Sequence, residues 1–363
     1  MRKERKELIS PFAVLSVFVF IIIGIMYVIT DLSADFADRV NGSISQGFRR
    51  IMAGFGDIFP FSLFEILVIC SPLIIFFVVR QGIKRFNNRE GRVRFIINLL
   101  AVVLLIYSGH ILALGIAHNA TALSKKMELD DVDVTAENLS EALLDLTDEI
   151  NYLAPLVPRN EKGVFESGYS YATLSEKICK SYSVFSERYN LPRNYNSIAK
   201  GVTFGPAMSY LGITGIYTYV TGEANVNNTY PDYVTIFTTA HEMSHQRGIL
   251  RENEANFAAY IVTASSDDIC LNYSAAMYMY SYISSALYKA DKDAYFEIRA
   301  GLCDEASADY KASSEVSEKY GDTIIEEISD WINDFYLQSS GSGGIVSYGR
   351  VVELLIAYRE SEK

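Results

Sequence analysis

Two histidines and one glutamate stand at helical spacing in the segment 239–245. On a helix, His241 and His245 share one face because residues four apart are neighbours, so both could bind one metal ion through a ring nitrogen. Glu242 would then face the water on the metal. The pattern also occurs by chance on exposed helices, but two of the four histidines fall in it, and the apolar residues 233–240 favour a buried helix. The spacing predicts zinc-dependent hydrolysis with Glu242 as general base.

A third ligand is expected just after this helix. Gly248 can end the first helix, and a second helix that begins near Glu252 would bring carboxylates back to the metal. Two His and one Glu, with a fourth position for water, form a known zinc hydrolase ligand set. Glu252 and Glu254 both qualify, although either could instead favour the start of the second helix through its dipole. Residues two apart on a helix cannot both face one ion, so one of them should point away.

Four pieces of the sequence resemble a bacterial membrane-protein family catalogued as domain of unknown function 3810, which is placed among gluzincin-type zinc peptidases. They are Pro60–Leu63, Gly222–Asn227, His241–Gly248 and Glu252–Phe257. Glu252-x-x-x-Asn256 also resembles the Glu-x-x-x-Asp of membrane-embedded zinc endopeptidases, in which the first Glu binds the metal. The resemblance implies a zincin-like fold, Glu252 as ligand, and Asn256 and Glu254 as its neighbours. Asn256 stands where those relatives carry Asp, so it could support the site by a hydrogen bond but not by charge.

Three apolar segments are long enough to cross a bilayer as helices, at about 12–30, 63–79 and 95–117. The chain of 363 residues therefore divides into a membrane region, 1–117, and one catalytic domain, 118–363. The first segment follows basic residues, as a signal peptide would, but its length and the lack of a clear cleavage site favour an uncleaved helix. Contact with membrane lipid is expected.

Basic residues predict the orientation of these helices. Four precede the first helix and six lie between Arg80 and Arg94, so both segments should be cytoplasmic in a bacterial cell. Residues 118–363 would then lie outside the cytoplasmic membrane. The first 117 residues carry 13 basic and 8 acidic side chains, which leaves −12 − 5 = −17 for the remainder. An acidic outer domain argues against nucleic acid as a partner and against tight docking on anionic lipid.

The outer domain is expected to be mainly α, a helical zincin-like (α+β) domain with a small sheet or edge strand. Residues 212–220 are rich in Ile, Thr, Tyr and Val and predict a strand before the metal helix. A free strand edge there could hold an extended peptide or protein substrate, including a cell-envelope peptide. Ala224, Asn225 and Asn227, which follow, are the candidate substrate contacts. They could equally be turn residues after a core strand.

Two features of the membrane region have more than one interpretation. Glu65, His110 and His118 lie in or near apolar segments, where ionisable groups are functional candidates, although helix packing is the simpler explanation. Apolar residues recur at near-helical spacing in the connector 31–61. That connector is either an interfacial helix or a packed link.

The metal motif does not specify a donor for the oxyanion. The Gly-rich hinge 339–344 precedes an apolar C-terminal segment, whose first residues Tyr348 and Arg350 could reach into the cleft. Tyr348 could instead only pack. The sequence thus predicts a membrane-anchored zinc metallopeptidase, and the alternative is a non-catalytic sensor or assembly factor that binds peptide or envelope material and keeps a zincin fold.

Overall fold

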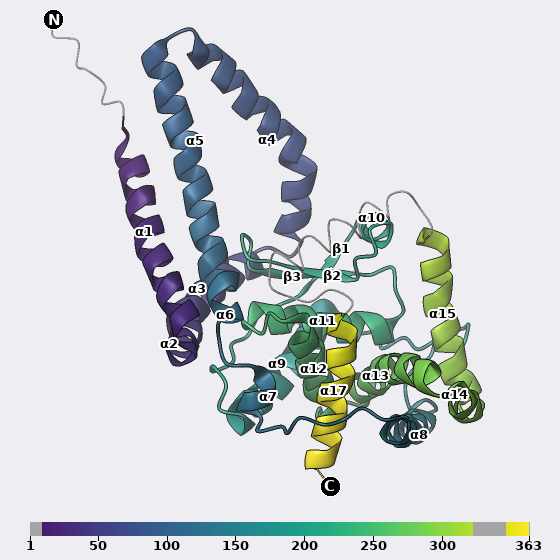
Figure 1. Cartoon of the computed structure of the whole chain (residues 1–363). Helices are drawn as coiled ribbons and strands as arrows, with labels where there is room; N and C mark the ends of the chain where they lie inside the picture. The colour runs from purple at the N-terminus through teal and green to yellow at the C-terminus, as the bar shows by residue number, and fades with distance from the viewer. Residues whose placement is uncertain (1–8, 322–345, 363) are drawn as a thin grey trace, which may run out of the picture.

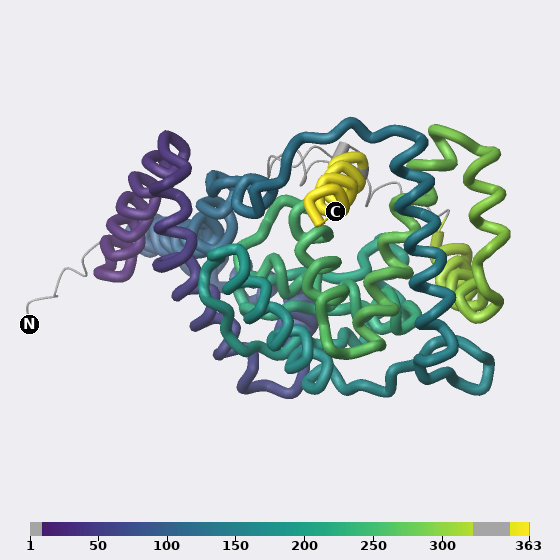
Figure 2. Tube along the Cα trace, turned by 90° about the horizontal axis from the view of Figure 1, so that it is seen from below, coloured from purple at the N-terminus to yellow at the C-terminus, as the bar shows by residue number. Residues whose placement is uncertain are grey.

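The computed structural model describes residues 9–321 and 346–362 and consists mainly of helices with one three-stranded sheet (Figure 1). The prediction of a mainly α chain with a small sheet is therefore confirmed. Three long helices stand together against one side of a helical domain. Seen from below, these helices lie at one end of the molecule and α14 and α15 at the other (Figure 2).

The three long helices are apolar enough to cross a membrane. They are α1 (Pro11–Leu32), α4 (Leu63–Phe86) and a third span, Arg89–His118, made of α5 (Arg89–His110), the π-helix η2 (Ile111–Gly115) and α6 (Ile116–His118). Ser10 and Ser62 cap α1 and α4 by accepting backbone N–H bonds. Three spans are therefore confirmed by length and composition, and their orientation remains a prediction.

The connector between α1 and α4 is mainly helical: α2 (Ala34–Val40), the π-helix η1 (Asn41–Ser45) and α3 (Gln46–Asp57). Arg49 on α3 is fully buried and donates to the carbonyls of Ala113 and Asn41 at 3.0 and 3.1 Å. Its guanidinium also lies against Gly248, where a Cβ would come within 2.4 Å of Nη2. Through Arg49 the connector thus packs against the third long helix and the end of the predicted metal helix, while Ile44, Ile51 and Phe55 are exposed, so the interfacial helix stays an open interpretation.

The helical domain has one large hydrophobic core. Its main helices are α8 (Ala136–Leu153), α9 (Tyr171–Arg188), α11 (Asp232–Gln246), α12 (Glu252–Ala264), α13 (Ile269–Ala290) and α17 (Val346–Ser361). Thr135 and Asn138 form a reciprocal cap at the start of α8, and the apolar face of this helix is buried. The shorter helices are α7 (Leu123–Lys126), α10 (Gly205–Ser209), α14 (Lys292–Arg299) and α15 (Asp304–Tyr320).

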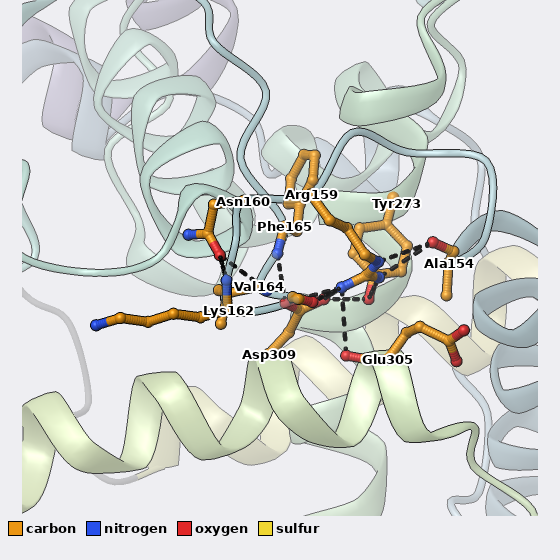
Figure 3. A network of polar contacts seen from close by, with 10 residues as sticks. Ala154, Arg159, Asn160, Lys162, Val164, Phe165, Tyr273, Glu305 and Asp309 are labelled. Atoms are coloured by element: carbon orange, nitrogen blue, oxygen red, sulfur yellow. Dashed lines mark hydrogen bonds and ion pairs between the residues drawn. The ribbon is translucent and has the colours of Figure 1, made fainter.

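An ion pair between Arg159 and the buried Asp309 connects the loop after α8 to α15. Asp309 of α15 is fully buried and accepts hydrogen bonds from Arg159 at 3.0 Å, from the Tyr273 hydroxyl at 2.6 Å and from the Phe165 N–H at 2.7 Å (Figure 3). Arg159 also donates to the carbonyl of Ala154. With its acceptors occupied in this way, the buried carboxylate serves packing.

The sheet contains β1 (Lys200–Val202), β2 (Gly215–Thr218) and β3 (Glu223–Asn227) in the order β1-β3-β2. β3 pairs parallel with β1 and antiparallel with β2. The predicted strand 212–220 is therefore present as β2, and it is an edge strand. The residues expected to be substrate contacts form instead the central strand, every residue of which is buried. The sheet lies over α11 on the side of the membrane helices (Figure 1).

Candidate metal centre

Helix α11 carries both histidines and ends where its sequence predicts. Gly248 adopts φ +87°, and the N–H groups of Gly248 and Ile249 donate to the carbonyls of His245 and Ser244, both at 3.0 Å. This pair of bonds is a Schellman motif, which requires a left-handed residue that glycine adopts without strain. The turn reverses the chain and brings the first residue of α12, Glu252, back to the histidines.

His241, His245 and Glu252 form a compact cluster. The two imidazole rings lie 4.6 Å apart between centroids and nearly perpendicular, and each offers its Nε2 to the Glu252 carboxylate. The distances from Nε2 to the carboxylate oxygens are 3.3 Å for His241 and 3.5 Å for His245. One ligand atom from each of the three residues lies within 4.8 Å of the others. This is the one group of three or more His, Cys, Asp or Glu side chains in the described residues that could hold a metal ion.

The remaining ring nitrogen of His245 is held by the backbone. Nδ1 lies 2.9 Å from the carbonyl oxygen of Ile249. A carbonyl can only accept, so Nδ1 carries a proton and Nε2 is free to bind a metal. His241 Nδ1 is buried without a hydrogen-bond partner in residues 9–321 and 346–362. The protein therefore fixes the ring orientation of one ligand directly.

The charges in the cluster are those of a site built for a cation. Burial alone would lower the pKa of His245, but Glu252 outweighs it and raises that pKa to about 9. Burial would likewise raise the pKa of Glu252, yet His245 and His241 hold it well below its usual range. Without a metal, the carboxylate thus draws a proton onto the imidazole. A divalent cation would replace that proton and satisfy all three ligands.

Glu242 lies under the edge strand. Its side chain is buried, and burial raises its pKa, although the nearby His241 and His245 lower it in part. A Cβ at Gly215 of β2 would lie 2.6 Å from Glu242 Oε1 and 2.6 Å from a methyl carbon of Thr238. Only glycine leaves room for the carboxylate at this point. The structure therefore places Glu242 between the metal cluster and β2.

Glu254 faces away from the cluster. Its Oε1 accepts from the N–H of Leu123 at 2.9 Å and from Arg251 at 3.0 Å. Arg251 also donates to the carbonyls of His118 and Ala120, at 2.8 and 3.0 Å. The residue before Glu252 and the residue two after it thus tie the start of α12 to the end of the third membrane span.

The other predicted helpers are placed less directly. Asn256 is half-buried one turn after Glu252 and makes no side-chain hydrogen bond within the described part of the chain. Arg350 is exposed on α17, a helix that packs on α12 and α13. The side chain of Tyr348 lies outside the described residues. An oxyanion donor from α17 stays a prediction.

The expectation for Ala224, Asn225 and Asn227 is corrected by the structure. Ala224 is fully buried in β3, and Asn225 accepts from the Ser62 hydroxyl at 2.7 Å. Asn227 donates to the Ser209 hydroxyl oxygen at 2.9 Å and to a backbone carbonyl. These side chains are consumed by structural bonds because β3 is the central strand, so they cannot contact a substrate.

Strand β2 is an outer strand of the sheet, and within residues 9–321 and 346–362 no other strand pairs with its second edge, which we call the free edge. Asn227 N–H donates to the Thr214 carbonyl at 2.8 Å, and hydrogen-bonded pairs alternate along an antiparallel ladder. Gly215 and Tyr217 therefore turn their N–H and C=O groups away from β3. The N–H of Tyr217 faces the Glu242 carboxylate. An extended chain laid along this edge would pass next to Glu242.

Glu65, His110 and His118 lie in or near the long apolar helices. Glu65 accepts from the N–H of Phe204 at 2.7 Å. His110 stacks on Tyr107 and meets Tyr219 edge to face. These contacts favour helix packing for Glu65 and His110, the simpler of the two interpretations. The backbone carbonyl of His118 accepts from Arg251, a contact that does not involve its imidazole.

These observations define the class of protein: a mainly helical chain with three apolar helices that could span a membrane and a His-His-Glu cluster that could hold a metal ion. Residues 36–356 match the family model described as "Protein of unknown function (DUF3810)", so the chain belongs to that family. No curated protein and no solved structure matches the chain.

Several contributing residues were missed by sequence reasoning. Arg251, Gly215 and Glu223 do their work through contacts with distant segments, which no local spacing reveals. Glu223 caps α4 by accepting from the N–H groups of Leu63 and Phe64, both at 2.9 Å. One signal was available: Pro60–Leu63 and Gly222–Asn227 stood out together in the sequence, and the structure shows them in contact.

Proposed function

We propose that this chain is a membrane-anchored zinc metallopeptidase related to the gluzincins. The observation that carries the proposal is the convergence of His241, His245 and Glu252, which lie next to a buried Glu242 and a free strand edge. Each part has a use in peptide hydrolysis. Two imidazoles and one carboxylate suit zinc and leave a position open.

The proposed chemistry divides between the ion and the chain. Zinc, when bound, supplies a Lewis acid that polarises the scissile carbonyl and lowers the pKa of water. Glu242 accepts the proton of the attacking water on a carboxylate oxygen and gives it to the leaving amine. Burial raises the pKa of Glu242, which makes its carboxylate a stronger base for accepting that proton. Glu252 and the two histidines hold their ligand atoms in place.

The substrate would be an extended peptide or protein segment, including a cell-envelope peptide. The outward N–H and C=O groups of Gly215 and the C=O group of Tyr217 would pair with its backbone as an added strand, while the Tyr217 N–H is bonded to Glu242. This mode of binding uses hydrogen bonds to the substrate's main chain, so the strand edge itself selects little among substrate sequences. The absence of a side chain at Gly215 keeps the edge close to Glu242.

The proposed location is the bacterial cytoplasmic membrane, with the N-terminus inside and residues 118–363 outside. The basic residues before α1 and between Arg80 and Arg94 support this orientation. A reporter that is active only after export, fused after Lys363, should be active. Activity of a reporter that works only in the cytoplasm, fused at the same position, would show that the orientation is the reverse of the one proposed.

The proposed activity is tested by Glu242→Gln in the full chain, purified in detergent and loaded with zinc. Turnover of a quenched-fluorescence peptide library should fall by about 10²-fold or more because the proton carrier is lost. Zinc content should stay the same. The control is Glu187→Gln, which changes an exposed glutamate on α9 in the same way.

Two outcomes would count against the peptidase. Equal turnover in Glu242→Gln and the unchanged chain would remove the proposed role of Glu242. A zinc-loaded chain that binds peptides but cleaves none would favour the sensor or assembly factor.

A further inference from the structure

The 22 residues from 201 to 222 contain no Asp, Glu, Lys or Arg. This is unusual in a domain that carries a net charge of about −17 and exposes most of its charges to water. The segment includes α10 and the edge strand β2. Its composition predicts an environment other than bulk water for the side chains that it exposes.

The position of the segment is fixed by α4. The N–H of Phe204 donates to Glu65, which lies in the first turn of this membrane-length helix. At the other end of the segment, Glu223 caps the same helix at Leu63. The backbone of Phe204 therefore lies beside the first turn of α4, where the apolar part of that helix begins. In Figure 1, α10 sits on the side of the domain from which α4 rises.

Several apolar side chains in and near this segment are exposed. Phe204 is 57% exposed, although its backbone is anchored by Glu65. Phe61, Tyr210 and Leu211 are also exposed, and we call these four residues the interfacial patch. On α4 itself, exposed apolar side chains begin at Ile66 and Leu67, one turn after the helix start that Phe61 precedes. Aromatic residues are typical of the zone where a protein meets lipid headgroups.

We propose that the interfacial patch is a fourth membrane contact, inserted into the headgroup region of the leaflet that the N-terminal end of α4 reaches. The occupant is the phospholipid surface itself. Because residues 201–222 carry no charge and the domain is acidic, attachment would rest on apolar burial and not on attraction to anionic lipid. A neutral membrane should therefore suffice.

The contact has a consequence for the metal centre. β2 belongs to the same uncharged segment, and Tyr219, just after it, donates to the carbonyl of Ile106 on α5 at 3.3 Å. The free edge is thus held at the level of the membrane helices. In combination with the proposed function, on which this step rests, the substrate would be a chain that emerges from the bilayer. The lipid contact itself does not depend on catalysis.

The test uses tryptophan as a depth probe. The chain has one Trp, Trp331, so Trp331→Phe gives a silent background. Phe204→Trp is compared in that background with Phe296→Trp on α14, because Phe296 is 59% exposed but lies at the far end of the domain from the membrane helices. Both full-length variants are placed in vesicles of phosphatidylcholine with or without brominated acyl chains, since bromine quenches only tryptophan in contact with lipid.

Brominated lipid should quench the emission of Phe204→Trp by at least about twofold and leave that of Phe296→Trp unchanged, because an interfacial side chain lies at the acyl-chain boundary. Leu211→Trp repeats the test should Phe204→Trp fail to fold, and it should be quenched too. Equal quenching at the two ends of the domain, or a blue-shifted emission at 204 and 211 without quenching, would overturn the proposal. The second result would mean that protein covers the patch.

Discussion

The helix pair α11–α12 and strand β3 both bury polar side chains, but they use them in opposite ways. In β3, the Glu223 carboxylate accepts hydrogen bonds from backbone N–H groups at the start of α4, and the Asn225 side chain accepts one from the cap residue Ser62. In the helix pair, the Glu252 carboxylate and the imidazole Nε2 atoms have only one another as polar partners within the part of the chain that the structure describes. Since burial of a polar group must be compensated, the two arrangements have different meanings. Complete pairing marks a structural role, and converging ligand atoms mark a site for an ion.

The comparison is sharpest between Glu252 and Glu254, two carboxylates on the same turn. Glu252→Gln should weaken zinc binding by about 10²-fold or more, because it removes a charged ligand, whereas Glu254→Gln should change it by less than about tenfold. Zinc competition with a fluorescent chelator measures both. If Glu254→Gln loses zinc and Glu252→Gln keeps it, the ligand assignment is reversed.

The next largest effect is the pH dependence of zinc binding, which follows from the raised pKa of His245 in the metal-free cluster. With its pKa raised to about 9, His245 is protonated at neutral pH, and zinc must displace that proton. Zinc affinity should therefore rise by about tenfold per pH unit between about pH 7 and 9 and level off above. Titration calorimetry in buffers of different ionisation enthalpy also counts the protons released. A pH-independent affinity would contradict the charge state assigned to the cluster.

The same shift has an opposite effect on the metal-free fold. A raised pKa means that the His245–Glu252 pair stabilises the folded chain fully below the ordinary histidine pKa and loses this contribution as the pH rises through about 9. Thermal stability of the metal-free chain should fall over that interval. The zinc-loaded chain should not show this loss.

Strand β3 should respond in stability and not in metal binding. Glu223→Gln replaces a buried acceptor pair at the start of α4 with one acceptor and one donor, so the free energy of unfolding should fall by about 1–3 kcal/mol. Thermal unfolding in detergent checks this, with the exposed Glu187→Gln as control. Zinc lost from a folded Glu223→Gln variant would break the distinction between the two regions.

The smallest effect is expected at β2, the strand that pairs with β3 and lies against Glu242. Gly215→Ala places a methyl group 2.6 Å from Glu242 Oε1, so the carboxylate must shift, and turnover should fall by about tenfold with zinc content unchanged. Gly54→Ala on α3 has no atom within 4 Å of the new methyl group and should leave turnover unchanged. Unchanged turnover in both variants would show that the position of Glu242 relative to β2 does not matter for hydrolysis.

Local pattern predicted much of this molecule. The helix around His241, its end at Gly248, the return of Glu252 and the three apolar helices all depend on spacing and composition within short segments. These features are set by helix periodicity and by glycine conformation, which a sequence displays directly.

The assignments that needed long-range contacts were harder. Asn225 was expected to contact substrate or to be a turn residue after a strand, but it lies in the central strand because β1, more than twenty residues earlier, pairs with its other edge. The strand order could not be derived from local propensity. Gly215 and Arg251 matter only through partners brought near by folding.

The central claim is that His241, His245 and Glu252 bind one zinc ion. X-ray absorption at the zinc edge of the purified full chain tests it most directly, since it reports the ligand atoms themselves. We predict two imidazole nitrogens at about 2.0–2.1 Å, light oxygen ligands at about 2.0–2.2 Å, and the loss of one imidazole in His245→Ala. A chain that binds no zinc, or a sulfur shell at about 2.3 Å that persists in that variant, would contradict the account.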